Sequence, residues 1–196
     1  MESVSEIFLN SVRYVCPTIS EAELSAFSNI LHIREFEKKV TIIEAGTVQQ
    51  EIGLVVQGLV RSSYIDTRGD EITVGFYPEG EYATHYPSFI ARKPSRYCIQ
   101  SLEPTTMVFM SYENIQLMYE KFPSVERYGR LIAEAVLKRQ QARIESFIFQ
   151  SAEERYLDFM HQYPSLFNRV TLSHLCSYLG IERQSLTRIR QKLAHK

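Results

Sequence analysis

The sequence has few cysteines and no long apolar segment. Its three cysteines, Cys16, Cys98 and Cys176, lie far apart with no CxxC pair, which argues against a disulfide framework, a zinc site or an iron–sulfur cluster. No apolar run approaches the roughly 18 residues that a membrane-spanning helix needs, and residues 1–6 lack the basic start of a signal peptide. We therefore expect a cytoplasmic protein with reduced thiols and no membrane partner.

The charge is nearly balanced but unevenly distributed. The formal net charge of the 196 residues is -1. From Arg169 to the C-terminus, however, six basic residues stand against one acid, whereas the preceding residues hold 16 basic and 22 acidic side chains. This asymmetry predicts a polyanionic partner for the C-terminal end. The length suits two modest domains.

Short β-rich segments dominate the first half of the chain. They cover residues 40–43, 52–56, 59–65, 72–76, 97–101 and 107–110, a spacing that predicts an all-β barrel or jelly roll. Turn residues at 57–58 and 66–70 predict two hairpins. Ser20 and Glu23 form a capping-box pattern that predicts a short helix from there to about His32.

A long helix is predicted from Ser124 to about Gln150, after a short one that Ser111 caps and that ends before Pro123. Apolar residues recur along it at three- and four-residue spacing and predict a dimerisation seam, made of Val125, Tyr128, Ile132, Ala135 and Ala142. The alternative is that this face packs on the barrel of its own chain. A second capping box, at Ser151, begins a new helix. We expect domains at 1–122, 123–150 (the dimerisation helix) and 151–196.

Residues 172–190 carry the spacing of a helix-turn-helix. Leu175 and Leu179 lie one turn apart on the inner face of a first helix, and Leu186 and Ile189 do the same on a second. Gly180 permits the tight turn between them. The second helix, residues 183–193, would be the recognition helix that enters the major groove.

The side chains on the outer side of this motif are the candidate DNA contacts. Arginine pairs with guanine and glutamine with adenine, so Arg183, Gln184 and Arg188 are the candidate base readers, together with Ser185 and Thr187. The candidate phosphate contacts are Arg169, Thr171, Ser173, Arg190 and Lys192. The alternative interpretation is a small helical hairpin whose basic face is merely solvated.

These features together resemble the Crp/Fnr family. Residues 183–188, Arg-Gln-Ser-Leu-Thr-Arg, are similar to the family's Arg-Glu-Thr-Val-x-Arg pattern. The resemblance implies an α+β fold: an N-terminal jelly-roll β-barrel of the cyclic-nucleotide-binding type, a long dimerisation helix and a C-terminal helix-turn-helix. It also implies a homodimer that reads a palindromic operator in double-stranded DNA, with RNA polymerase as a further candidate partner.

A second resemblance is to the family's phosphate-binding cassette. The residues that match it imply a nucleotide site in which Glu81 meets the ribose and Arg96 the cyclic phosphate; the matching positions are Gly80, Glu81, Ala83, Arg96 and Tyr97. Tyr97 replaces a small hydroxyl residue, and residues 85–87, His-Tyr-Pro, add bulk where phosphate should bind. We therefore predict a regulator that cAMP does not control. The alternatives are cAMP or another small anionic ligand, or a structural role for Glu81 and Arg96.

Enzymatic activity is not expected. A barrel-type metalloenzyme would need several converging histidines, and the β-rich segment contains only His85. No nucleophile–base set or metal cluster is visible, so we predict neither catalysis nor a metal. The remaining rival is an effector-binding module whose helical tail binds a protein.

Overall fold

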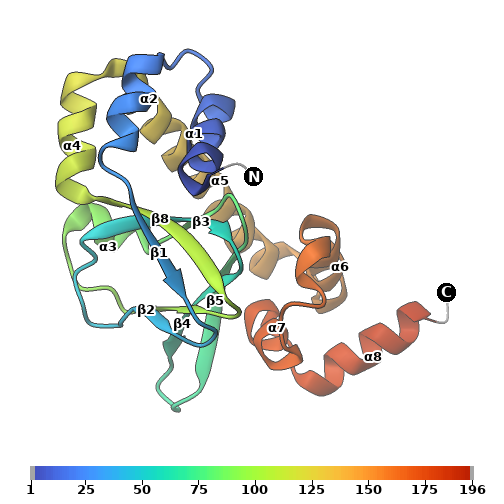
Figure 1. The fold of residues 1–196 in the computed structure, drawn as a ribbon. Helices are drawn as coiled ribbons and strands as arrows, with labels where there is room; N and C mark the ends of the chain where they lie inside the picture. The colour runs from blue at the N-terminus through green and yellow to red at the C-terminus, as the bar shows by residue number, and fades with distance from the viewer. Residues whose placement is uncertain (1–2, 195–196) are drawn as a thin grey trace. The chain divides into compact units, whose positions relative to one another are not determined.

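The computed structural model describes residues 3–194 and has a β-rich part, a long helix and C-terminal helices (Figure 1). The elements are, in order, α1 (Val4–Val15), α2 (Glu21–Ser28), β1 (His32–Phe36), β2 (Thr41–Ile43), β3 (Glu51–Gln57), β4 (Val60–Ile65), β5 (Glu71–Tyr77), β6 (Tyr82–Ala83), α3 (Tyr86–Ala91), β7 (Cys98–Ser101), β8 (Thr105–Ser111), α4 (Tyr112–Lys121), α5 (Pro123–Phe149), α6 (Ala152–Gln162), the 3-10 helix η1 (Pro164–Leu166), α7 (Leu172–Leu179) and α8 (Arg183–Ala194).

The chain forms two compact units. The first comprises Met1–Ser62 and Phe76–Val136, and the second comprises Ser63–Gly75 and Leu137–Lys196. Helix α5 contributes residues to both. The domain boundaries expected after residues 122 and 150 stay predictions. Among residues 3–194, the structure has no helix with the length and apolar content needed to cross a bilayer.

Two four-stranded sheets build the β-rich part. Their strand orders are β1-β8-β3-β6 and β2-β7-β4-β5, and the pairs β1–β8, β3–β8, β3–β6 and β2–β7 are antiparallel. Successive side chains of a strand point to opposite faces, so one strand serves two cores. Val108 and Met110 of β8 lie in a core shared with the helices, and Met107 and Phe109 lie in a second core.

Local turn and cap chemistry explains most element boundaries. Ser20 and Ser151 form the predicted capping boxes at the starts of α2 and α6, and Ser111 caps α4. The hairpin at 66–70 is confirmed: β4 and β5 are neighbours, and the Asp66 carboxylate accepts hydrogen bonds from the backbone N–H groups of Arg68 and Asp70.

Other local predictions were wrong. The segment at 57–58 is not a hairpin turn, because β3 and β4 belong to different sheets and the chain crosses between them. The helix predicted to reach His32 ends at Ser28, and His32 begins β1, which pairs with β8. The sequence interpretation also missed α1, which Ser3 and Glu6 cap.

The predicted dimerisation seam needs correction at its N-terminal end. Val125 and Tyr128 are 1% and 4% exposed and lie in the core of their own unit, with Ile132 packed against it. These three side chains therefore pack on the β-rich part of their own chain, which was the alternative interpretation. Val125 and Tyr128 are too buried to contact a second copy. Ala135 and Ala142 are exposed.

Candidate nucleic-acid interface

Helices α7 and α8 pack against each other around a short turn. Thr171 caps α7 by accepting a hydrogen bond from the His174 backbone N–H at 3.2 Å. Gly180 ends α7 at φ +62°, in the left-handed region that glycine adopts without strain. The four predicted inner-face side chains, Leu175, Leu179, Leu186 and Ile189, are buried, and Cys176 and Ile181 are buried with them. Burial raises the pKa of the Cys176 thiol, so this small side chain stays neutral in the core.

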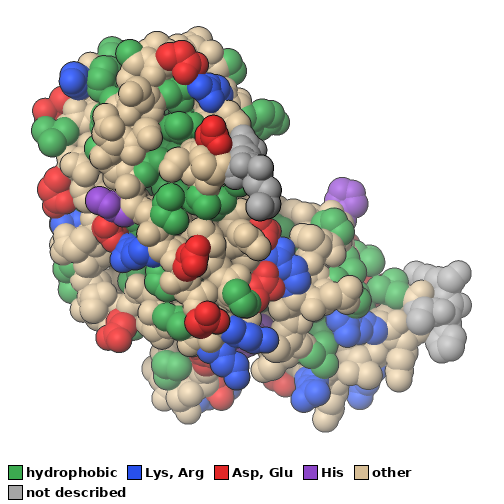
Figure 2. Space-filling model, viewed as in Figure 1, with side chains coloured by type: hydrophobic (Ala, Val, Ile, Leu, Met, Phe, Trp, Pro, Cys, Tyr) green, Lys and Arg blue, Asp and Glu red, His purple; other side chains and the backbone are tan. Residues whose placement is uncertain are grey.

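The outer face of α8 is exposed and basic. Arg183, Gln184 and Arg188 are all exposed, whereas Leu186 and Ile189 on the other side of the helix are buried. Thr187 is also exposed, but its hydroxyl donates to the Arg183 carbonyl at 3.0 Å, which leaves it only as an acceptor. Figure 2 shows Lys and Arg side chains recurring along α8. The predicted base readers thus share one solvent-facing side of one helix.

The predicted phosphate contacts fall into two groups. Thr171 and Ser173 are exposed at the start of α7, the end of a helix that favours an anion. Arg190 is half-buried: its Nε donates to the Tyr156 hydroxyl at 3.2 Å, and its guanidinium lies 4.9 Å from the Phe167 ring centre. Arg190 thus also holds α8 against α6, and it stays a predicted phosphate contact.

Lys192 and Arg169 also have partners within the protein. The Lys192 ammonium lies 2.6 Å from the Glu153 carboxylate, in an exposed ion pair. Such pairs are weak, so Lys192 can exchange its carboxylate for a phosphate. Arg169 is half-buried and already interacts with another group of the protein. Both stay predicted phosphate contacts.

Two arginines that the sequence interpretation missed fix α7 to α6 and to the end of α5. Arg155 on α6 donates from Nε to the Leu179 carbonyl at 2.9 Å and from Nη1 to the Gln150 carbonyl at 2.7 Å. Arg143 on α5 donates to the Tyr178 carbonyl at 2.8 Å and lies 3.8 Å from the Tyr178 ring centre. The carbonyls at the C-terminal end of α7 thereby gain cationic donors, which also suit the helix dipole.

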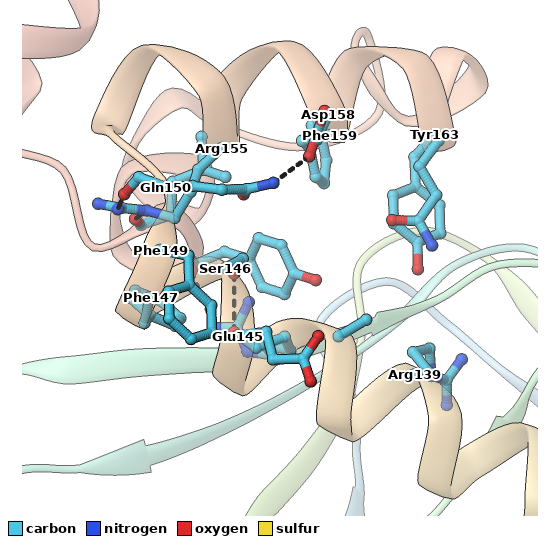
Figure 3. Close-up of a pocket in the computed structure, with 15 residues that line it drawn as sticks. Arg139, Glu145, Ser146, Phe147, Phe149, Gln150, Arg155, Asp158, Phe159 and Tyr163 are labelled. Carbon is cyan, nitrogen blue, oxygen red and sulfur yellow. Dashed lines mark hydrogen bonds between the residues drawn. The ribbon is translucent and has the colours of Figure 1, made fainter.

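These arginines line a cavity of about 380 Å³ between α5, α6 and α7 (Figure 3). Figure 3 also shows the turn from α5 to α6, where the Gln150 side chain donates to Asp158 at 2.5 Å. The guanidinium groups of Arg143 and Arg155 are already bonded to carbonyls and stacked on Phe147. The two arginines beside the cavity therefore brace α7 against α5 and α6.

One further contact within the second unit involves the β4–β5 turn region. The Ser177 hydroxyl on α7 accepts a hydrogen bond from the Thr73 backbone N–H at 2.8 Å and donates to the Glu71 carbonyl at 3.3 Å. Ser177 is thus anchored on its own unit rather than available to a ligand.

The predicted nucleotide cassette is present as a segment, but its charged residues do not converge in a buried site. Gly80 and Arg96 are exposed, Glu81 and Tyr97 are half-buried, and Ala83 is buried in a core. A buried phosphate needs a charged donor beside it. The exposed Arg96 side chain does not supply that donor in this conformation.

Aromatic side chains occupy the cassette instead. The rings of His85 and Tyr97 meet edge to face with centres 4.4 Å apart, and His85 Nδ1 lies 2.6 Å from the Ser88 hydroxyl. Burial lowers the pKa of the His85 imidazole, which favours the neutral ring. Within residues 3–194 the structure has no cluster of three or more His, Cys, Asp or Glu side chains placed to hold a metal.

Residues 33–122 match the cyclic nucleotide-binding domain family. The c-di-GMP-responsive global regulator CLP of Xanthomonas campestris superposes with a TM-score of 0.70 at 17% identity, covering 90% of this chain and 92% of that one. FixK2 from Bradyrhizobium japonicum gives 0.74 at 14% identity, covering 85% of each chain. The catabolite activator protein of Thermus thermophilus gives 0.58 at 18% identity, covering 92% and 86%. No curated protein sequence matches the chain.

The β-rich part thus matches the cyclic nucleotide-binding domain family, and a long helix and C-terminal helices follow it. With this order of parts, the chain has the fold of the Crp/Fnr regulators, which confirms at the level of the fold the family resemblance drawn from its motifs.

Proposed function

We propose that this chain is a DNA-binding transcription regulator of the Crp/Fnr type, in which α7 and α8 are a helix-turn-helix and α8 enters the major groove. One observation carries the proposal: Arg183, Gln184 and Arg188 are exposed together on α8, while the opposite side of that helix is buried on α7. A recognition helix must combine these two faces. The strand orders of the two sheets support a jelly roll for the N-terminal domain.

The exposed apolar side of α5 supports a homodimer. Leu137, Ile144 and Ile148 are 67%, 55% and 65% exposed. They are seven and four residues apart, so they lie on one side of the helix, opposite Ala135 and Ala142. An apolar stripe of this kind gains free energy by pairing with a second copy. Pairing through this stripe would present two recognition helices to a palindromic operator.

Control by cAMP is not part of the proposal. The His85 and Tyr97 rings and the exposed Arg96 argue against a buried cyclic phosphate in this conformation. The second candidate is a regulator that responds to cAMP or another small anion, and calorimetric titration with cAMP separates the two, because binding at micromolar concentration would favour the second. A cytoplasmic location, RNA polymerase as a partner and the absence of enzymatic activity stay predictions.

Selection of bound sequences from random DNA tests the function. Wild-type protein should enrich a palindromic site. Arg183→Ala and Arg188→Ala should each cost about 1–3 kcal/mol at that site and relax the base preference at one position per half-site. Arg127→Ala, which removes an exposed arginine from α5, is the matched control and should leave the preference unchanged. Unaltered selectivity in both α8 variants would refute the groove assignment.

The rival in which the C-terminal helices bind a protein gives a different result. Binding to DNA phosphates releases counterions and weakens steeply as salt rises. A tail that recognises a protein would show no salt-dependent affinity for duplex DNA of any sequence.

A further inference from the structure

A second cavity, lined by apolar residues, lies within the first compact unit. Its volume is about 230 Å³, and strands β3, β6 and β8 together with α2, α3, α4 and α5 contribute its walls. The residues that line it are mostly aromatic or aliphatic, among them Phe27, Phe89, Met110, Tyr112, Val125 and Ile132. No proposed DNA contact lies in it.

The lining determines the charge of any occupant. The residues of the described chain that form the cavity include no Lys, Arg, His, Asp or Glu. Transfer of an ion from water into such surroundings costs far more free energy than contacts with uncharged side chains gain. A cyclic nucleotide or a carboxylate is therefore excluded, and a ligand here has to be neutral.

Two buried tyrosines in the cavity wall leave one hydroxyl hydrogen without an acceptor among the described residues. The hydroxyl oxygens of Tyr82 and Tyr128 are 2.8 Å apart, and the two side chains belong to residues that are 6% and 4% exposed. One of the two hydroxyls donates its hydrogen to the other in this bond. The structure gives neither hydroxyl a second partner among residues 3–194, so the pair has one hydrogen left to donate.

A third tyrosine closes the same region. The Tyr119 hydroxyl lies so near the Gly129 backbone that a Cβ atom there would be 2.0 Å from it. Gly129 therefore gives the Tyr119 ring its place in the wall. Burial raises the pKa of Tyr119 to about 12 and raises the pKa values of Tyr82 and Tyr128 as well, which keeps all three hydroxyls protonated at neutral pH.

We propose that this cavity binds a neutral monocyclic compound with one carbonyl group, whose ring fills the apolar part and whose oxygen accepts the hydrogen bond that the Tyr82–Tyr128 pair has left to donate. The size fits, because an apolar cavity of about 150 Å³ in another protein holds benzene. The polarity fits too, since a buried donor is costly until an acceptor reaches it. The site goes beyond the proposed DNA-binding function and does not depend on it.

Ligand-detected NMR titration of the full chain with three probes tests the site. Acetophenone carries the carbonyl, isopropylbenzene has nearly the same shape without an acceptor, and benzoate is the charged analogue. Acetophenone should bind with one-to-one stoichiometry and about fivefold more tightly than isopropylbenzene, the contribution of one net hydrogen bond. Benzoate should show no saturable binding.

The double variant Tyr82→Phe/Tyr128→Phe tests the hydrogen bond itself. It removes both hydroxyls and keeps the ring volumes, a change that is close to neutral for stability. Acetophenone affinity should fall about fivefold, to that of isopropylbenzene, while isopropylbenzene should bind at least as tightly as it binds wild type. A single variant would be less informative, because the remaining tyrosine could donate its own hydrogen to the ligand.

The control variant is Tyr14→Phe, at a tyrosine that is 87% exposed; it should leave both affinities unchanged. Thermal unfolding of each variant checks that the fold is intact. Equal affinity of wild type for acetophenone and isopropylbenzene, no binding of either compound, or full acetophenone affinity in the double variant would each overturn the proposal. DNA binding of the same samples is measured separately, so failure of this site and failure of the regulator function are distinguishable.

Discussion

The Arg155 guanidinium on α6 holds the C-terminal end of α7 through a 2.9 Å hydrogen bond to the Leu179 carbonyl. Its second hydrogen bond, to the Gln150 carbonyl, ties the same side chain to the turn between α5 and α6. One side chain thus fixes the helix that supports α8 to the helix that precedes it. The orientation of the exposed arginines of α8 depends on this brace.

We predict that Arg155→Ala destabilises the second unit by about 1–3 kcal/mol, because two carbonyls lose a charged donor. Denaturant unfolding followed by circular dichroism measures the change. Arg188→Ala is the control. Because the Arg188 side chain is exposed, the free energy of unfolding of this variant should stay within about 0.5 kcal/mol of wild type. If both variants unfolded alike, Arg155 would have no bracing role.

The helix pair could be predicted from sequence because its determinants are local. Leu175, Leu179, Leu186 and Ile189 lie at helical spacing around Gly180, and all four are buried as expected. Arg155 could not be found in this way, since its partner Leu179 is 24 residues away and any arginine can bond a carbonyl. Long-range hydrogen bonds leave no periodic signal in a sequence.

The misassigned seam has a related cause. Apolar periodicity shows that one side of a helix is buried, but not which surface buries it. Val125 and Tyr128 satisfy the pattern by packing into their own core. The predicted nucleotide cassette shows a different limit. Its sequence pattern is partly present, but the rings of His85 and Tyr97 contact each other within it. These residues are 12 positions apart, so neither residue alone reveals the contact.

We predict that α5 pairs through its exposed apolar stripe. Leu137→Glu and Ile144→Glu place charges on that side and should shift a dimer toward monomer, because each buries a carboxylate on association. Sedimentation equilibrium measures the molar mass. Ala135→Glu and Ala142→Glu, on the other side of α5, should remain dimeric. The reverse result would restore the seam originally predicted from the sequence.

We predict an acid-sensitive contribution to stability from His85. Burial lowers the pKa of this imidazole in the folded state, so the unfolded chain binds a proton at a higher pH than the folded chain does. The contribution is complete above the unfolded pKa of about 6.5 and is lost as the pH falls from there through the lowered folded pKa. Urea unfolding at about pH 7.5 and pH 5.5 should therefore show that the free energy of unfolding of wild type falls on acidification. The fall should be smaller in His85→Gln. His161→Gln, at an exposed position, should retain the wild-type fall.

The ion pair between Lys192 and Glu153 predicts a specific change in non-specific DNA binding. Lys192 can neutralise a phosphate only by leaving the Glu153 carboxylate, which lies 2.6 Å away. Glu153→Gln removes that competitor and should strengthen binding to random duplex DNA. Lys192→Ala should weaken it and reduce the slope of log K against log salt by about 0.9, the value for one phosphate contact.

The double variant separates competition from a general charge effect. If Glu153 acts through Lys192, Glu153→Gln should have no effect once Lys192 is alanine. If instead the carboxylate simply repels the DNA backbone, Glu153→Gln should strengthen binding equally in both backgrounds. Titrations at several salt concentrations distinguish these results, because loss of one phosphate contact changes the slope whereas a base-reading contact changes the dependence on sequence.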